Sequence, residues 1–445
     1  MAKPGSVAGD ILNYYGNGTN ASQGPNNKTF YYDMAGIKAA NRKKVYAQFA
    51  DSRQMPQRHG KEYRVKVQIH SYDRMPYEEN SLNTIGGKKT FTSDFSKLGY
   101  ISGRNLADLT NYVYGSDGKD YTGQTYANNG VRLLEGEGPA NKFSLKDMTI
   151  TTRFEKFGEM IEYTDEVVLF SEDPMQVRYR EELGERANCL YEDLLQLELL
   201  ATPTVMYAGT ATSLETLGTG IGTGAPDPVT LTNAIEESYK INYGLIQKAV
   251  QKLFRNRAPK HTSILKGDVR IGTTPINAAY VAIVGPEVKL DIENMIRGVT
   301  YEKNFVFTPV YMYANQTTIM ENEFGRVNDI RFIVSESAIV ERGRGAVVDT
   351  GYTGRLSYTE VNKTGAGGGK ENRFDVFPIL IPCAGSFATI GLAGANKIEF
   401  MSLSPNDVSI LNPFKTKGFF AYKFWFAALI TRPERLLRIN VLASA

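Results

Sequence analysis

The organisation of this chain is decided by one long segment, DPMQVRYREELGERANCLYEDLLQLELL, at positions 173–200. Its apolar side chains recur at steps of three and four residues, the spacing of one helix face. Pro174 stands in the first turn, where proline is favoured, and Pro203 follows the end. At about 1.5 Å per residue the helix would be about 42 Å long, which indicates an architectural spine. The predicted apolar stripe is Leu183, Ala187, Leu190, Leu194, Leu197 and Ala201, with Arg186, Glu192, Asp193 and Glu198 outside it.

Two strands are predicted on either side of a long excursion that precedes this helix. Residues 63–70 and 148–157 alternate between apolar and polar side chains, the two-residue period of a strand. Residues 71–146 between them are rich in Gly, Asn and Tyr, and so long a structureless loop is improbable inside a compact domain. We therefore expect an extended hairpin whose flanking strands pair antiparallel at its base. Residues 1–60, with many turn formers, are predicted to be an extended arm.

The rest of the chain mixes helices and strands. Helices are predicted at 232–257 and 288–295, strands at 280–284 and 329–334, and a surface loop at 362–373. The chain closes with predicted strands at 374–382, 385–391, 418–430 and 435–442. Strands, a long helix, a mixed region and further strands in this order are typical of the α+β class.

Composition excludes several classes of protein. The formal net charge is only +3, which argues against a protein dedicated to coating nucleic acid. Apolar residues make up 42% and charged residues 22%, so wholesale disorder is excluded. Cys189 and Cys383 are too few for a disulfide framework. With no secretory signal and no apolar run of about 18 residues, the chain is expected to fold in a reducing cytoplasm.

No catalytic constellation is present in the sequence. The glycines of 218–224 alternate instead of following the dinucleotide fingerprint, and 365–370 lacks the Ser or Thr of a P-loop, so flexible loops are favoured over phosphate cradles. His59, His70 and His261 belong to no catalytic motif. We predict no catalytic, cofactor-binding or metal-binding residues and no cofactor.

Charged clusters have ordinary explanations with open alternatives. Asp165, Glu166, Glu172 and Asp173 suit the N-terminus of a helix, with a metal site as the alternative. The basic clusters are interpreted as solvated faces, with contact to a polyanion or an acidic neighbour as the alternative. They lie at 42–44, at 88–89 and at Arg255, Arg257 and Lys260.

An ordered set of short motifs carries a family resemblance. The motifs are LLEGEGP at 133–139, TITTRFEKFG at 149–158, EFGRV at 323–327, and NPF at 412–414 leading into the aromatic strand with Trp425. Together they resemble the major capsid proteins of schitovirus-type tailed bacteriophages. Residues 1–130 carry no matching motif.

The resemblance implies the Hong Kong 97-like phage coat fold, which has an N-terminal arm, an extended loop, a peripheral domain with a spine helix, and an axial domain. On this chain the arm would be 1–60 and the extended loop, with an insertion, 61–148. The peripheral strands and spine would be 149–230 and the axial domain 231–400. Residues 401–445 would return as closing strands of the peripheral domain.

The implied function is that of a non-enzymatic major capsid protein, which self-assembles into the icosahedral shell around phage double-stranded DNA. Implied partners are further copies in pentamers and hexamers, candidate scaffold, portal and cement proteins, and packaged DNA contacted non-specifically; no membrane contact is expected. The protein would assemble in the host cytoplasm and reside in the virion capsid. Two alternatives stay open: a nucleotide-binding enzyme that uses the Gly-rich loops, and another virion protein such as a portal or tail tube.

Overall fold

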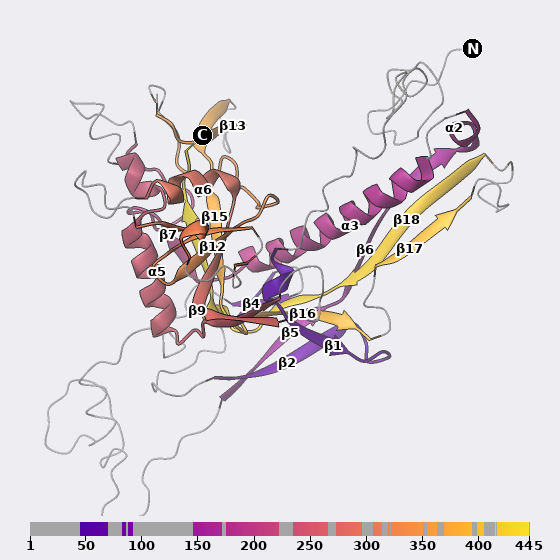
Figure 1. Ribbon diagram of the computed structural model, residues 1–445, viewed down its shortest axis with the longest axis horizontal. Coiled ribbons are helices and arrows are strands. Elements are labelled where there is room, and N and C mark those ends of the chain that lie inside the picture. The colour runs from indigo at the N-terminus through magenta and orange to yellow at the C-terminus, as the bar shows by residue number, and fades with distance from the viewer. Residues whose placement is uncertain are drawn as a thin grey trace, which may run out of the picture. The chain divides into compact units, whose positions relative to one another are not determined.

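The computed structural model shows a chain of mixed helices and strands, which confirms the α+β class (Figure 1). The described residues are 45–69, 82–85, 88–91, 146–170, 175–221, 235–265, 273–295, 306–313, 319–320, 322–349, 352, 354–362, 369–393, 398–404, 414 and 416–444. Most of the predicted arm and much of the predicted extended loop therefore lie outside the described residues.

The chain divides into two compact units. The first comprises residues 1–63, 153–197 and 388–429, and the second 64–152, 198–387 and 430–445. These units interleave along the sequence, so each is built from segments far apart in the chain. The five-part division into arm, loop, peripheral domain, axial domain and closing strands stays a prediction.

The first unit is built on a three-stranded antiparallel sheet and one long helix. The sheet order is β17 (Glu399–Leu403), β18 (Lys417–Phe426) and β6 (Glu155–Thr164). The predicted spine is confirmed as α3 (Met175–Leu200), which runs along these strands (Figure 1). Tyr191 of α3 contacts the rings of Phe424 and Phe426, and Tyr179 contacts that of Phe420. Aromatic contacts therefore join the helix to the central strand.

The buried face of α3 differs from the predicted stripe in its second half. Leu183 and Ala187 are buried as expected, but the face then continues through Leu195 and Leu199. Leu197, predicted to be buried, is 58% exposed. In the second half of α3 the sequence places leucines on two faces of the helix. The contact of Tyr191 with β18 determines which of these two faces is buried. Glu192, predicted to lie off the stripe, is buried at 5% exposure.

Shorter elements complete the first unit. The 3-10 helix η2 (Ala47–Phe49) leads into β1 (Asp51–Met55), which pairs in parallel with β16 (Phe387–Leu392). The other neighbour of β16 is β19 (Ala428–Ile430). Helix α2 (Asp165–Phe170) follows β6 directly.

The two strands that flank the excursion pair with each other as predicted, but the strand predicted over 148–157 is divided at Phe154, beyond which β6 begins. They are β2 (Glu62–Ile69) and β5 (Lys146–Arg153). Within the excursion, β3 (Leu82–Ile85) and β4 (Lys88–Phe91) form an antiparallel hairpin. The excursion thus contains secondary structure of its own, as its length led us to expect.

The second unit contains an eight-stranded mixed sheet. Its path is β10 (Thr308–Pro309), β11 (Glu323–Val327), β12 (Ile330–Val334), β9 (Thr273–Val284), β15 (Phe377–Pro382), β20 (Leu436–Val441) and β7 (Val205–Tyr207), with β8 (His261–Leu265) paired to β9. Every residue of β20 is buried. Strand β12 is parallel to β9 and β20 is parallel to β7, whereas β15 is antiparallel to both of its neighbours.

Helices and a hairpin accompany this sheet. Helix α5 (Tyr243–Arg255) and helix α6 (Pro286–Glu293) contribute buried side chains to the same core as the strands. The hairpin consists of β13 (Tyr358–Asn362) and β14 (Lys370–Phe374). Two short 3-10 helices, η5 (Val310–Met312) and η7 (Pro433–Arg435), complete the unit.

Some predicted elements differ from the structure in their bounds. The helix predicted over 232–257 is broken before α5, because Asn242 adopts an extended backbone and its side chain accepts a hydrogen bond from the Leu245 N–H at 2.8 Å. Such N-caps start a new helix. The surface loop predicted over 362–373 was wrong at its C-terminal end, where residues 370–373 form β14. There Lys370 pairs with Glu360 across the hairpin at 2.8 Å.

Two substitutions on α6 should separate core packing from surface exposure. Ile292 is fully buried, so Ile292→Ala should lower the free energy of unfolding by about 2–5 kcal/mol. Leu290, on the same helix, is 56% exposed, and Leu290→Ala should change it by less than about 0.5 kcal/mol. Chemical denaturation of the unassembled chain measures both values, and equal effects would contradict the assigned orientation of α6.

Candidate assembly surface

The β17-β18-β6 sheet has two chemically different faces. Residues directly opposite in an antiparallel pair lie on the same face. Along β18, Phe420, Tyr422, Phe424 and Phe426 are buried, whereas the alternate residues from Phe419 to Trp425 are partly exposed. We call the face that contacts α3 the helix face and the opposite one the outer face.

An ion pair and a tyrosine connect the helix face to α3. Arg186 donates two hydrogen bonds to the Glu159 carboxylate on β6, at 2.9 and 3.1 Å, and the Tyr422 hydroxyl donates a third at 2.9 Å. The hydrogen bond from Arg186 is the largest cause that lowers the pKa of Glu159. Burial is the largest cause that raises the pKa of Tyr422. The ionised carboxylate thus binds one side chain from the helix and one from the central strand.

The outer face carries a row of apolar side chains that crosses all three strands. Met160 of β6 is opposite Ala421 of β18, which in turn is opposite Met401 of β17. Met160 is 55% exposed and Met401 is 41% exposed. We call these three residues the outer apolar row. Exposed apolar side chains that adjoin one another mark contact sites for other proteins.

Charged pairs border this row. On one side Lys423 binds Glu399 at 2.7 Å, and on the other Lys417 lies 4.0 Å from Glu162. Among the described strands, β17 and β6 each have one partner in this sheet, so each presents an unpaired edge. An apolar centre with a charged rim resembles the general layout of protein interfaces.

The glycine-rich segment around position 220 packs against the core of the second unit. Leu217 and Ile221 are buried, and a Cβ at Gly218 would lie 2.7 Å from the ring of Phe374. Gly218 and Gly220 have positive φ angles of 97° and 90°, which explains their identity. Gly222, Gly224 and most of 365–370 lie outside the described residues, while Gly369 and Lys370 lead into β14.

The histidines and the acidic group do not come together. His59 is exposed and bonds the Gln57 carbonyl, whereas His261 is buried against the Pro382 carbonyl. Asp165 and Glu166 occupy the first turn of α2, a separate helix that was not predicted, and not the start of the spine helix. His70, Glu172 and Asp173 lie outside the described residues. Within the described part of the chain, no three His, Cys, Asp or Glu side chains form a group suited to a metal ion.

One basic cluster is partly neutralised in the second unit. Lys260 pairs with Asp329 at 2.9 Å and lies over the rings of Phe254 and Tyr280. Lys88 and Lys89 lie on β4, and residues 42–44 fall outside the described chain. Cys189 and Cys383 form no disulfide, and Cys383 is buried.

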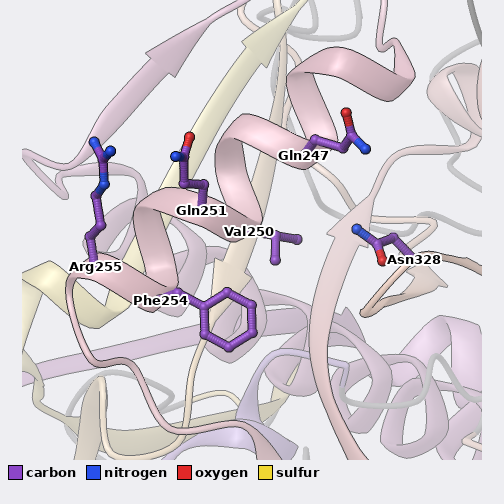
Figure 2. A pocket seen from close by; sticks show the side chains of 6 residues that line it. All are labelled: Gln247, Val250, Gln251, Phe254, Arg255 and Asn328. Carbon is purple, nitrogen blue, oxygen red and sulfur yellow. The ribbon is translucent and has the colours of Figure 1, made fainter.

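A shallow depression of about 500 Å³ lies on α5 near the turn between β11 and β12. Figure 2 shows the side chains that α5 contributes and Asn328 opposite them. The lining consists of amides, one guanidinium and apolar groups, namely Gln247, Val250, Gln251, Phe254, Arg255 and Asn328. This lining contains no carboxylate, imidazole, thiol or hydroxyl, so it offers neither a general acid–base pair nor a nucleophile. It therefore gives no support to the enzyme alternative.

None of the helices that the structure describes has the length and apolar character needed to cross a bilayer.

Comparison with known proteins finds a full-length similarity to a phage capsid protein. No family model matches it. Over 450 aligned residues, which cover 100% of both chains, it is 24% identical to the major capsid protein of Pseudomonas phage KPP21. The chain is thus a relative of phage major capsid proteins, which confirms at this level the resemblance seen in its motifs. The schitovirus type stays a prediction.

Solved phage capsids are similar to the chain over nearly its whole length. The capsid of Ralstonia phage GP4 has a TM-score of 0.48 at 9% identity and covers 96% of this chain and 98% of its own. The Cyanophage Pam1 capsid has a TM-score of 0.46 at 10% identity and covers 94% and 96%.

The outer apolar row and the burial of Glu192 were missed by the sequence prediction. Met160 lies out of phase with the buried side of its strand, and Met401 lies in a segment for which no strand was predicted. In the sequence, Met160 is an apolar residue between Glu159 and Ile161, which lie on the helix face of the strand. An apolar residue at this alternate position was the available signal for a second apolar face.

The Glu159 network predicts a pH-dependent stability. The folded-state pKa of Glu159 is below its ordinary value of 4.5. The free energy that the ionised Glu159 contributes to folding is therefore fully present above pH 4.5 and is lost as the pH falls through the folded-state pKa. Glu159→Gln should therefore lower the thermal midpoint above pH 4.5 and flatten its decline at lower pH. Thermal unfolding at a series of pH values checks this, with Glu155→Gln on the same strand as the control. Equal pH profiles for Glu159→Gln and the wild type would exclude the network.

Proposed function

We propose that the chain is the subunit of an icosahedral shell that encloses the double-stranded DNA of a tailed phage. The observation that carries this proposal is the full-length similarity to a phage major capsid protein. Copies would form pentamers and hexamers whose heterologous contacts close into a shell. The protein would act structurally and would not catalyse a reaction.

The outer apolar row supports this role because it gives the first unit a surface for a second copy. Met160 and Met401 retain about half of their exposure in the single chain. Burying them against another copy would gain hydrophobic free energy in proportion to the apolar area covered. The charged pairs at the border would then favour one orientation of the neighbour over others.

The predicted extended loop supports the same role. Its base is fixed by the pairing of β2 with β5, and it carries the β3-β4 hairpin. A two-stranded ribbon has little core of its own and gains stability when it lies on another surface. The proposal is that residues 61–148 reach over a neighbouring copy.

The remaining partners follow from the shell. A net charge of +3 is sufficient for non-specific contact with packaged DNA, because such binding depends on phosphate neutralisation and not on base sequence. Assembly in the host cytoplasm, with scaffold, portal and cement proteins as candidate partners, completes the proposal. No observation favours a nucleotide-binding enzyme, a portal or a tail tube.

Deletion of the loop provides the main test. A chain in which a short Gly-Ser linker replaces residues 75–145 should stay folded and soluble, because β2 and β5 are both retained in full. It should form no shells. Negative-stain electron microscopy and sedimentation compare it with the intact chain, which should form large particles. Shells of normal size from the shortened chain would refute the role of the loop, and the lack of particles from the intact chain would refute the shell.

A charge in the outer apolar row should block assembly without unfolding the subunit. Met401→Asp should reduce the yield of shells by about tenfold or more, since a contact worth about 1.4 kcal/mol changes an equilibrium tenfold. Ser402→Asp is the matched control, because Ser402 is the next residue of β17 and lies on the other face. Light scattering measures assembly, and thermal unfolding verifies that both variants fold. Equal yields from the two variants would exclude this face from the contact.

A further inference from the structure

The depression on helix α5 combines an exposed aromatic ring with unpaired positive charge. We call the residues that line it the α5 hollow (Figure 2). Phe254 is 52% exposed there, and the adjoining Arg255 is exposed as well. The exposed Lys248 precedes Gln251 by three residues, a spacing that places both on one side of the helix. Neither Arg255 nor Lys248 pairs with a carboxylate among the described residues.

A surface of the opposite charge lies on and beside helix α6. Leu290 is 56% exposed, and Glu287, one turn earlier, is exposed too. Glu336 is exposed just beyond β12, where the Ser335 N–H donates to the Val284 carbonyl at 2.9 Å, close to the start of α6. In the part of the chain that the structure describes, neither glutamate pairs with a cation. We call Glu287, Leu290 and Glu336 the α6 face.

The α5 hollow and the α6 face lie at opposite ends of the same two parallel strands. Ile330 of β12 is opposite Tyr280 of β9 at the start of the pairing, and Val334 is opposite Val284 at its end. The ring of Phe254 contacts that of Tyr280, with 5.9 Å between the centroids, so the hollow belongs to the start. Helix α6 follows the end. Four residues of strand separate the two ends by about 13 Å, so the α6 face of one copy does not reach the hollow of that same copy.

We propose that the α5 hollow of one copy binds the α6 face of a second copy, with Leu290 against Phe254 and Glu287 beside Arg255. This rests on the proposed shell function. Complementary charges fix the orientation of two partners, and burial of the two exposed apolar side chains gains hydrophobic free energy. Because each copy carries both surfaces, the same contact repeats from one copy to the next. A heterologous contact of this kind closes into a ring when its rotation allows it.

Nucleic acid is the other partner that a basic surface could bind, and the hollow suits it less well. Binding to DNA phosphates depends on the number of cations, and the lining contains only Arg255. The rest of the lining is apolar or carries an amide. An acidic protein surface with an apolar centre matches each part, because the amides of Gln247 and Gln251 donate hydrogen bonds and Phe254 provides apolar area.

Reversal of the charge on each side tests the contact. Arg255→Glu and Glu287→Arg should each lower the yield of shells by about tenfold or more, because each places like charges opposite one another. A chain with both substitutions should return to within about threefold of the wild-type yield, since the attraction is restored with its direction reversed. Arg344→Glu is the matched control, an exposed arginine of the second unit outside the hollow. Light scattering and electron microscopy measure assembly, and thermal unfolding verifies folding.

A second variant tests the apolar part of the contact without a change of charge. Leu290→Ala should lower the yield of shells by about threefold or more, although it leaves the unassembled chain as stable as the wild type. Val347→Ala is the control, because Val347 is 53% exposed in the same unit and belongs to neither surface. If a charge-reversal chain does not fold, Leu290→Ala decides by the same measurement.

Each outcome decides the proposal. Recovery by the doubly substituted chain would support it. Normal assembly of the single variants, or a doubly substituted chain that stays defective, would overturn it. If Arg255→Glu assembles normally but binds mixed-sequence double-stranded DNA more weakly than the wild type, the hollow is a nucleic-acid surface and the proposal is wrong.

Failure of the shell function would be recognised separately. A wild-type chain that forms no shells would overturn that function, and sedimentation velocity of the concentrated chains would then judge the contact by itself. The wild type and the doubly substituted chain should self-associate to a similar extent, and more than either single variant. Equal sedimentation of all four chains would exclude the contact.

Discussion

The packing of one helix on one strand determines the structure of the first unit. The alternate residues of β18 from Phe420 to Phe426 are buried, and rings from α3 contact them. Because side chains of a strand alternate between faces, this contact fixes which residues of β6 and β17 lie toward the helix. A shift of one residue in either pairing would bury the charges of the outer face and expose the aromatic rings. The register of the sheet is therefore tied to the helix.

The same alternation of side chains between the two faces of the sheet produces an apolar surface that the first unit leaves uncovered. With aromatic side chains on the helix face, the outer face receives Met160, Ala421 and Met401 as adjacent residues. No helix or strand of the first unit is recorded against this row in the described residues. In a single chain the aromatic side chains of β18 are thus buried on the helix face, whereas apolar side chains on the outer face stay exposed. That division is physically suited to a building block, whose second face is completed by another copy.

Two groups of buried charges in the second unit are satisfied by partners within it. Arg331 and Glu323 form a hydrogen-bonded pair at 2.6 Å on neighbouring strands, and both are buried. Asp375 accepts hydrogen bonds from the Gly343 N–H and from the hydroxyls of Ser357 and Thr359. Removing one partner from such a network leaves an unpaired buried charge, so these groups contribute to a unique arrangement. Their role is to hold the sheet and hairpin, and no chemistry follows from them.

Sequence periodicity alone determined the spine helix, the strands on either side of the excursion, and the α+β class, because these depend on local spacing of apolar residues. The ordered motifs indicated a phage major capsid protein for the same reason: they are strings of neighbouring residues. Tertiary structure decided which face of α3 is buried after Ala187, that Asn242 interrupts the predicted second helix, and that β20 lies beside β15. It also decided that Glu192 accepts hydrogen bonds from the backbone N–H groups of residues 45–47 and that Met160 and Met401 form one row. Apart from the Asn242 cap, which is a local contact with Leu245, each of these joins residues far apart in the chain, and only their packing in space selects one contact among the several that the local pattern allows.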